Sequence, residues 1–390
     1  MEIAEIASLR VKLEQASAIP VLHIIKSLGR GGAEILLPET LRRHNQQKYA
    51  FHYIYFLPWK NQVVADIEQA GGKVVCLPAR GNMEMLMHVR RIVSYIKKHG
   101  IRLIHCHLPW AGIVGRLAGQ LAGIPVVYTE HNKWERYHRL TYYANKFSFS
   151  RQQKVIAVSG EVAQSIKKHY GRSFPEVQVI LNGIDTTRFA RNIPLDRDVR
   201  QELGIAPDTI VIGIACVFRA QKRLTAWLEV AAQLHQEFPQ LRFLIVGDGV
   251  LRNEINRKAQ LLGSEAYVHF AGLQADTRPW LKAMDIFMMT SEFEGLPIAL
   301  LEAMSMECMP ACTAAGGIPE LVHHHKNGLL APVEDPLQLA TLLAQCLNNP
   351  QQLAAMKKAA RETVVTSFDM RKMVGELEDV YDQLINVENS

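Results

Sequence analysis

Short apolar segments alternate along the chain with longer segments whose apolar residues recur at helical spacing. In the first half, the strand candidates are residues 21–25, 53–56, 73–77, 101–107, 126–129, 155–159 and 177–181, and helices are expected between them, for example at 33–44, 86–98 and 160–169. Strands separated by helices of about 10–15 residues form parallel βαβ units. The first half therefore predicts a doubly wound parallel sheet.

The same pattern restarts after a polar stretch at 186–199, which we interpret as a linker. The strand candidates of the second half are 209–218, 241–249, 266–272, 285–291 and 308–313. We predict an α/β fold of two Rossmann-like domains, residues 1–190 and 191–368, and a last helix at about 369–390 that packs on either domain. Ligands of such sheets bind beyond the carboxyl ends of the strands, so we expect the site in a cleft between facing domains.

Composition describes an ordinary globular protein without a membrane span. The chain has 390 residues, 48% of them hydrophobic and 21% charged, which excludes extended disorder. No run of about 18 apolar residues is present. The start, residues 1–17, has no signal-peptide pattern and predicts a short amphipathic helix, which packs on its own domain or rests on a membrane surface. The six cysteines form no C-x-x-C pair, which is typical of reduced thiols in a cytoplasmic protein.

The charge is divided unevenly. Residues 1–190 hold 26 Lys+Arg and 13 Asp+Glu, a net charge of +13, and the remaining 18 and 25 give the second half a net charge of −7. We expect the first half to meet an anionic partner: a membrane, a nucleic acid or a phosphorylated substrate. The basic, aromatic tract 131–154 fits stacked nucleic acid, a membrane-surface helix or plain packing with a solvated basic face.

The strongest motif is SEFEGLPIALLEAMS at 291–305, in which seven residues separate Glu294 from Glu302. Gly295 permits a tight turn, and Pro297 suits the first helical position. Free amides at such a helix start attract phosphate, and the two carboxylates could accept sugar and ribose hydroxyls. The alternative is an N-capping acid followed by a surface glutamate.

These residues, with AGGIPELVHHHKNGLL at 315–330, resemble glycosyltransferase family 4, the group 1 glycosyl transferases. Members are retaining enzymes of the GT-B fold, which has two Rossmann domains. The resemblance implies that Glu294 contacts the transferred sugar and that Glu302 binds the nucleotide ribose. It also implies a donor-binding segment formed by Gly295, Leu296, Pro297 and Ile298.

Other segments carry the same resemblance. Gly31 and Gly32 in SLGRGGAE would approach the donor phosphates, with a helix expected from Ala33, and Leu273 ends the FAGL loop that faces the base. In VFRAQKR, at 217–223, Lys222 matches the family's diphosphate lysine. Val217 stands where the family has arginine, so Arg219 or Arg223 would substitute. The family also has glycine where Glu307 stands and proline where Met309 stands.

Two histidine motifs complete the resemblance. His131 in YTEHN matches a histidine near the donor sugar, and HCH at 105–107 resembles the family's H-x-H. A metal is conceivable at HCH. However, we expect alternating strand positions to direct His105 and His107 to opposite faces, which argues against both as ligands. His323, His324 and His325 are interpreted as a solvated loop, and no metal site is predicted.

The resemblance implies a retaining, metal-independent glycosyltransferase of the hexosyltransferase type. It would need no cofactor and would take a nucleotide-diphosphate sugar, expected to be a UDP-sugar, as co-substrate. The acceptor would be a glycan or lipid-linked hydroxyl in cell-surface polysaccharide or lipopolysaccharide assembly. We expect a cytoplasmic protein in peripheral contact with the inner face of the membrane through its basic N-terminal domain, and no nucleic acid partner. The alternatives are a nucleotide-sugar epimerase of the same fold and a non-catalytic, membrane-associated nucleotide-binding protein.

Overall fold

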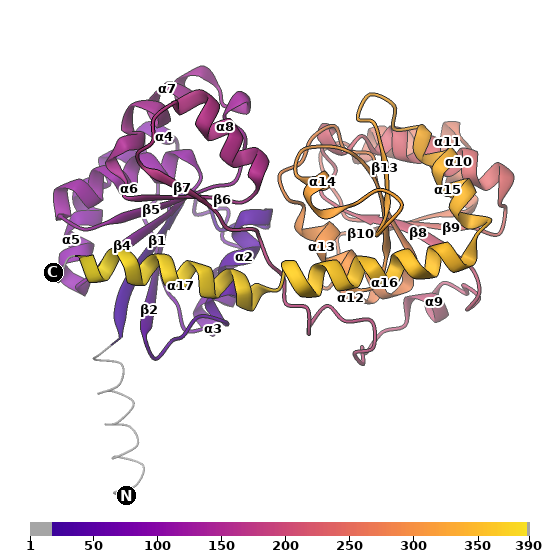
Figure 1. Ribbon diagram of the computed structural model, residues 1–390, viewed down its shortest axis with the longest axis horizontal. Helices are drawn as coiled ribbons and strands as arrows, with labels where there is room; N and C mark the ends of the chain where they lie inside the picture. The colour runs from indigo at the N-terminus through magenta and orange to yellow at the C-terminus, as the bar shows by residue number, and fades with distance from the viewer. Residues whose placement is uncertain (1–17, 388–390) are drawn as a thin grey trace, which may run out of the picture. The chain divides into compact units, whose positions relative to one another are not determined.

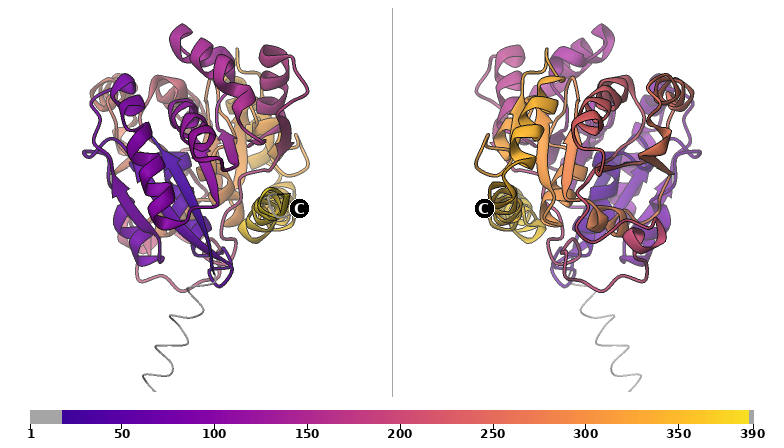
Figure 2. Two further views of the ribbon diagram at one scale, coloured as in Figure 1. Left: turned by 90° about the vertical axis from the view of Figure 1, so that its left-hand side faces the viewer. Right: turned by 90° about the vertical axis from the view of Figure 1, so that its right-hand side faces the viewer.

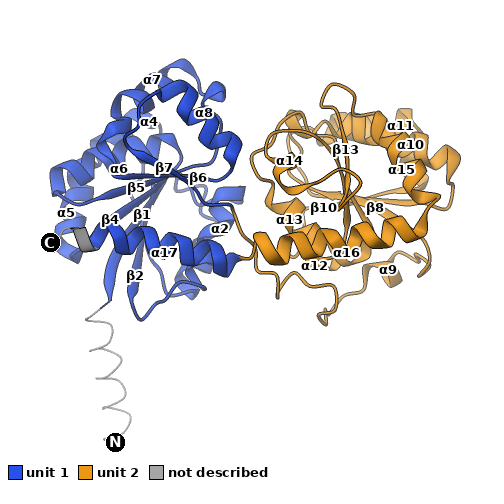
Figure 3. Cartoon of the chain, viewed as in Figure 1, with its two compact units in different colours: residues 1–181, 370–390 blue, residues 182–369 orange. Residues whose placement is uncertain are grey.

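The computed structural model describes residues 18–387, and the chain divides into two compact units (Figure 3). Unit 1 comprises residues 1–181 and 370–390, and unit 2 comprises 182–369. The helix expected at 1–17 lies outside the described residues. Unit 2 begins at Asn182 instead of residue 191, because the segment just before the expected linker and the linker's first residue are hydrogen-bonded to the end of unit 2. The Ile184 amide donates to the Phe368 carbonyl (2.9 Å), and the Thr186 hydroxyl donates to Asp369 (2.5 Å).

Unit 1 is a parallel sheet in the order β3-β2-β1-β4-β5-β6-β7 (Figure 1). Its strands are β1 (Ile19–Ile25), β2 (Tyr49–Tyr55), β3 (Lys73–Cys76), β4 (Leu103–His107), β5 (Val126–Glu130), β6 (Lys154–Ala157) and β7 (Glu176–Val179). Its helices are α2 (Gly32–Leu41), α3 (Val64–Gln69), α4 (Asn82–Met87), α5 (Val89–His99), α6 (Pro109–Ala122), α7 (Arg139–Ser148), α8 (Gly160–Tyr170) and α17 (Met370–Val387).

Helices cover both faces of this sheet (Figure 2). On one face α6 approaches so closely that a Cβ on Gly115 would overlap Cys106 Sγ. On the other face lies α17, where the Tyr381 hydroxyl is 2.6 Å from His105 Nδ1.

Residues 370–390 bring two Lys+Arg and five Asp+Glu to unit 1. The net charges of the two units are therefore +10 and −4, so the asymmetry is smaller than the division at residue 190 indicates.

Unit 2 is a parallel sheet in the order β10-β9-β8-β11-β12-β13. Its strands are β8 (Val211–Ala215), β9 (Arg242–Val246), β10 (Val268–Gly272), β11 (Ile286–Met289), β12 (Met309–Thr313) and β13 (Leu329–Ala331). Its helices are α9 (Val199–Glu202), α10 (Leu224–Glu237), α11 (Arg252–Leu261), α12 (Arg278–Ala283), α13 (Ile298–Ser305), α14 (Ile318–Leu321), α15 (Gln338–Leu347) and α16 (Pro350–Ser367).

The predicted strands correspond to β1 through β12, and the edge strand β13 was missed because three residues carry too little pattern. Glu307 adopts φ of 62°, in the left-handed region that favours glycine. This conformation accounts for the glycine that the family has there. Across residues 18–387, no helix combines the length and the apolar character needed to cross a bilayer.

Candidate active site

The strand order of each sheet reverses once, and several of the predicted site residues follow the strands at these two points, whereas His131 follows β5 and Leu273 follows β10. In unit 2 the reversal lies between β8 and β11, which are paired neighbours. Lys222 follows β8 and Glu294 follows β11. In unit 1 the reversal lies between β1 and β4, with Gly31 and Gly32 after β1 and His107 at the end of β4. Doubly wound sheets bind their ligands at such points.

Lys222 and Glu294 form an ion pair at the reversal point of unit 2. Lys222 Nζ lies 2.6 Å from Glu294 Oε1. The side chains are 14% and 7% exposed, so the pair is shielded from water and screened only weakly. A cation held in such an environment interacts strongly with an incoming anion, and its carboxylate partner can accept hydrogen bonds from hydroxyl groups.

Three loops of unit 2 are joined around this pair. The Thr290 hydroxyl donates to the carbonyls of Lys222 (3.1 Å) and Arg223 (3.0 Å), and the Glu292 amide donates to Gln221 (2.8 Å). Gly316 has φ of 60°, and a Cβ there would overlap the Glu294 carbonyl. The close approach of the loop after β12 to Glu294 therefore requires glycine.

The two arginines proposed to replace the family's diphosphate arginine have different environments. Arg223 Nε donates to the Thr290 carbonyl (2.8 Å), and its Nη2 donates to the Val333 carbonyl (2.7 Å). Arg219 is exposed and makes no side-chain hydrogen bond or ion pair with any residue of 18–387. Arg223 braces the loops, whereas Arg219 is available to an anion.

Helix α13 begins one residue later than expected, because Pro297 is its N-cap and Ile298 its first residue. Pro297 has ψ of 115°, an extended conformation that places it just outside the helix. Glu294 lies in the preceding loop, and Glu302 lies in the second turn and is half-buried. Gly295 and Ile298 are partly exposed, Leu296 is buried and Leu273 is exposed on its own loop.

The glycine loop of unit 1 presents an anion of its own. Gly31 is the N-cap of α2, which begins at Gly32 rather than Ala33. The Glu34 carboxylate lies against Gly31 and accepts a hydrogen bond from the Ser27 hydroxyl (3.1 Å). A phosphate approaching these first-turn amides would meet this carboxylate, which opposes it electrostatically.

Glu130, at the end of β5, organises the loop that carries His131, and sequence reasoning missed this role. Its buried carboxylate accepts hydrogen bonds from four groups: the Tyr128 hydroxyl (2.9 Å), the Trp134 indole (3.0 Å), the Asn132 amide (3.3 Å) and the Tyr137 hydroxyl. Burial raises the pKa of Glu130 to about 6, although these hydroxyl donors favour its charged form. The sequence signal for this role was an acidic residue at the end of an apolar strand, followed by several aromatic residues.

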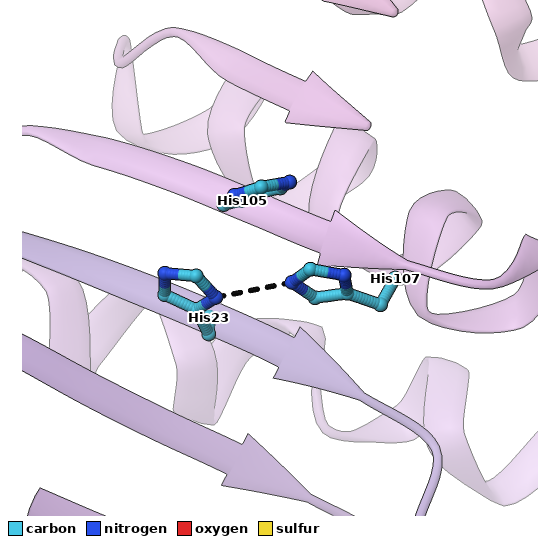
Figure 4. Close-up of side chains that lie close together, drawn as sticks. All are labelled: His23, His105 and His107. Carbon is cyan, nitrogen blue, oxygen red and sulfur yellow. Dashed lines mark hydrogen bonds between the residues drawn. The ribbon is translucent and has the colours of Figure 1, made fainter. Parts of the chain in front are cut away.

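His23, His105 and His107 form a buried cluster (Figure 4). The cluster lies on the face of the sheet where Tyr381 of α17 contacts His105. The expectation that His105 and His107 face opposite sides is wrong, because residues two apart in a strand share a face. Burial lowers the pKa of all three, so their rings are neutral at pH 7. His131, half-buried beyond β5, has a pKa lowered to about 4 by the same cause. His23, inside the apolar β1, was not singled out.

Comparison with known proteins gives the family. The sequence model of Glycosyl transferases group 1 matches residues 196–363, and that of Glycosyltransferase Family 4 matches residues 30–188. EpsF of Bacillus subtilis (strain 168), named as a glycosyltransferase, is 28% identical, with 93% of this chain and 96% of EpsF covered. The UDP-Gal:alpha-D-GlcNAc-diphosphoundecaprenol alpha-1,3-galactosyltransferase of Escherichia coli is 27% identical, with 78% and 82% covered.

Solved structures give the same result for the fold. HepE of Anabaena in complex with UDP and glucose has a TM-score of 0.80 and 25% identity, covering 93% of this chain and 99% of HepE. Sucrose-phosphate synthase of Thermosynechococcus elongatus has a TM-score of 0.78 at 18% identity, covering 95% and 100%. The topology of the two sheets, the matched family models and these similar structures all indicate the same family. The chain belongs to the group 1 glycosyltransferases of family 4, with the GT-B fold, and is a glycosyltransferase.

Proposed function

We propose that this glycosyltransferase moves a sugar from a UDP-sugar to an acceptor hydroxyl with retention of anomeric configuration, in the assembly of a cell-surface polysaccharide or lipopolysaccharide. The observation that carries the proposal is the Lys222–Glu294 pair, shielded from water at the reversal point of the unit 2 sheet. The pair supplies a cation for the leaving diphosphate and a carboxylate for sugar hydroxyls.

The diphosphate leaves with growing negative charge, and catalysis requires groups that meet this charge as it forms. Lys222 would serve one phosphate, Arg219 would approach from the same loop, and the first-turn amides of α13, beginning at Ile298, would donate hydrogen bonds. Glu294 would hold the transferred sugar, and Glu302 would bind the ribose. Retention would follow if the acceptor attacks from the face that the phosphate leaves.

The names of relatives support the choice of donor and acceptor. The E. coli relative is named for UDP-Gal and a diphosphoundecaprenol-linked acceptor, and HepE holds UDP and glucose. Another relative in Bacillus subtilis (strain 168), TuaC, is named for teichuronic acid biosynthesis. These names favour a UDP-sugar and a lipid-linked glycan acceptor over free nucleotide binding.

A lipid-linked acceptor requires contact with the membrane, and α7 offers a surface for it. Leu140, Tyr143 and Phe147 are 61%, 58% and 88% exposed and recur at i, i+3 and i+7, so they share one face of the helix. The exposed Arg139 and Arg151 flank this stripe. Exposed apolar residues beside cations suit an anionic bilayer surface. We propose that this face of α7 rests on the inner leaflet.

The transfer reaction can be tested with purified protein, UDP-, GDP- and ADP-sugars and a set of diphosphate-lipid-linked sugar acceptors. We expect product from a UDP-sugar, with the donor's anomeric configuration in the product's proton coupling constants. An inverted product would reject retention. Epimerised sugar formed without acceptor would support the epimerase, and failure of every nucleotide sugar to react or to raise the melting temperature would reject the proposal.

The membrane contact is tested by flotation with vesicles of phosphatidylglycerol and phosphatidylethanolamine. Replacing Tyr143 and Phe147 by serine should reduce binding at least tenfold, because each buried aromatic contributes about 1.5–3 kcal/mol. Val250→Ser, at a residue 91% exposed in unit 2, is the matched control and should bind normally. Equal binding by all three proteins would contradict the α7 assignment.

A further inference from the structure

A row of three histidine rings runs from the interior of the unit 1 sheet to the loop after β5. We call this row, formed by His23, His107 and His131, the histidine file. His23 Nδ1 lies 3.0 Å from His107 Nε2, and His107 Nδ1 lies 3.5 Å from His131 Nε2. His23 and His107 are 3% and 6% exposed, whereas His131 is half-buried. The file therefore has an inner end at His23 Nε2 and an outer end at His131 Nδ1.

The protons of this file are limited in number. Each neutral imidazole carries one N–H, which leaves its other nitrogen as an acceptor. Burial keeps all three rings neutral, so three N–H groups serve two ring-to-ring contacts and one end. His107 uses both nitrogens, and its single proton must face either His23 or His131. The tautomers of the three rings are consequently coupled.

The surroundings of His23 Nε2 decide whether the N–H groups of the three rings point inward or outward. His23 Nε2 is buried and has no hydrogen-bond partner among residues 18–387. If the protons pointed inward, an N–H would be stranded there, and a buried N–H without an acceptor is rarer in proteins than an unsatisfied acceptor. If they point outward, His23 Nε2 keeps only a lone pair, and the last N–H reaches the half-buried His131.

We propose that His23 and His107 are positioning residues that fix His131 as the Nδ1–H tautomer, so that it offers substrate a hydrogen-bond donor and not a general base. In this arrangement His23 Nδ1–H donates to His107, and His107 Nδ1–H donates to His131 Nε2. The consequence for catalysis rests on the proposed function and on the family resemblance, which matches His131 to a histidine near the donor sugar. The tautomer itself does not, because it is a property of the free protein.

A metal ion is the other use that this cluster invites, since ring nitrogens of His23, His105 and His107 lie within 4.8 Å of one another. His105 is already engaged at both nitrogens, by the Tyr381 hydroxyl (2.6 Å) and the Thr129 hydroxyl (2.7 Å). Coordination through His105 would break at least one of these two contacts. We therefore favour the hydrogen-bonded file, and the experiment includes a Zn²⁺ arm.

The tautomer is read directly by NMR of the full-length protein labelled with ¹⁵N-histidine, without substrate, at pH 7. Two-bond ¹H–¹⁵N correlations distinguish Nδ1–H from Nε2–H rings, and His131→Gln assigns the His131 signals by their loss. We expect Nδ1–H at His131. An Nε2–H or doubly protonated ring would overturn the proposal. So would Zn²⁺ bound stoichiometrically with shifts confined to the His23, His105 and His107 signals.

Two variants of His107 separate positioning from packing. In His107→Asn the amide Nδ2–H₂ retains a donor near the place of Nδ1, whereas His107→Leu removes it. We expect the pure tautomer at His131 in the asparagine variant and a mixture in the leucine variant. His52→Asn, a buried histidine of β2 paired with Tyr95 (2.8 Å), is the matched control and should leave His131 unchanged. A pure tautomer in all variants would overturn the coupling.

Activity adds a second reading. His107→Leu should lower kcat about tenfold, the size expected for one lost hydrogen bond, and His107→Asn should recover most of it. Equal losses in both variants, with unchanged melting temperatures, would indicate that His107 does not act through its donor. If the tautomer is as expected but no variant changes transfer, the positioning role fails while the transferase assignment stands.

Discussion

Both sheets place polar residues near the point where the strand order reverses, but the two points differ in how charge is compensated. At the reversal point of unit 2, a lysine and a glutamate stand 2.6 Å apart as charged groups. Near the reversal point of unit 1, buried histidines are neutral, and the Glu130 carboxylate is surrounded by neutral hydroxyl, indole and amide donors. In unit 2 the carboxylate is paired with a cation, whereas in unit 1 the Glu130 carboxylate is held by neutral donors of defined direction and the histidine rings are neutral.

This difference fits a division of labour. A departing diphosphate requires a nearby cation whose effect is strengthened by exclusion of water. Orienting a sugar requires hydrogen bonds whose donors and acceptors point in fixed directions, and neutral buried groups supply these at less desolvation cost than buried ions. On this view, loss of charge should be most damaging in unit 2 and loss of hydrogen-bond geometry most damaging in unit 1.

The largest effect is expected for Lys222→Ala. Removing a cation that meets charge developing in the transition state should raise the barrier by about 2–4 kcal/mol, or about thirty- to a thousandfold in kcat. Because the change also leaves Glu294 buried without its partner, the melting temperature must be measured alongside. Lys222→Ala combined with Glu294→Gln removes that burial penalty. Because Glu294 is itself proposed to hold the sugar, the double variant is compared with Glu294→Gln alone. Equal turnover of these two proteins would show that Lys222 does not act on the diphosphate.

Glu130→Gln should be the most damaging polar change in unit 1. A glutamine offers one acceptor oxygen and an NH₂ group that faces hydroxyl, indole and amide donors, so at least one donor is left unsatisfied. The free energy of unfolding should fall by about 1–3 kcal/mol, measured by chemical denaturation. Tyr137→Phe removes one donor and leaves the carboxylate, so it should cost less. If Glu130→Gln is neutral, the carboxylate does not organise the loop.

Much of this contrast could be predicted from the sequence, and the missing part has a physical cause. The apolar periodicity located β1 through β12. The spacing of Glu294 and Glu302, and the family resemblance that points to Lys222, singled out residues in the loop and helix after β11 and in the loop after β8, which is its neighbour in the sheet. The spacing could not show that Arg223 is engaged with carbonyls while Arg219 is exposed. It could not join His23 to His107 either, since their pairing is set by strand order and α17 closes the same face from the far end of the chain.

The two units should also respond to acid with opposite signs. Burial raises the pKa of Asp285 in unit 2, but Lys357 at 2.7 Å and Arg200 outweigh it, so the pKa lies below its ordinary value of 3.8. Its stabilisation is present above that value and is lost as the pH falls through the folded pKa. The pKa of Glu130 is instead raised from 4.5 to about 6. Its contribution is full below pH 4.5 and is lost as the pH rises through about 6, by about 2 kcal/mol.

Denaturation of the wild type, Asp285→Asn and Glu130→Gln between pH 3 and 7 separates these signs. The stability difference between wild type and Asp285→Asn should shrink below pH 4. The difference between wild type and Glu130→Gln should shrink between pH 4.5 and 7. Parallel curves for both variants would show that neither carboxyl has the stated shift.

The smallest expected effect sharpens the assignment within unit 2. Arg219 is exposed, so water and salt screen its attraction for the donor diphosphate, and Arg219→Ala should weaken donor binding by about 1 kcal/mol, or about fivefold in KM. Its melting temperature should not change, because the side chain contacts no described partner. Arg223→Ala should do the reverse and lower the melting temperature, since it removes the donors to the Thr290 and Val333 carbonyls.

Donor KM and melting temperature, measured for both variants at low and at high salt, test this. The KM difference between wild type and Arg219→Ala should vanish at high salt, because the contact is electrostatic and exposed. If Arg219→Ala leaves KM unchanged at low salt, Lys222 and the first-turn amides of α13 bind the diphosphate without an arginine.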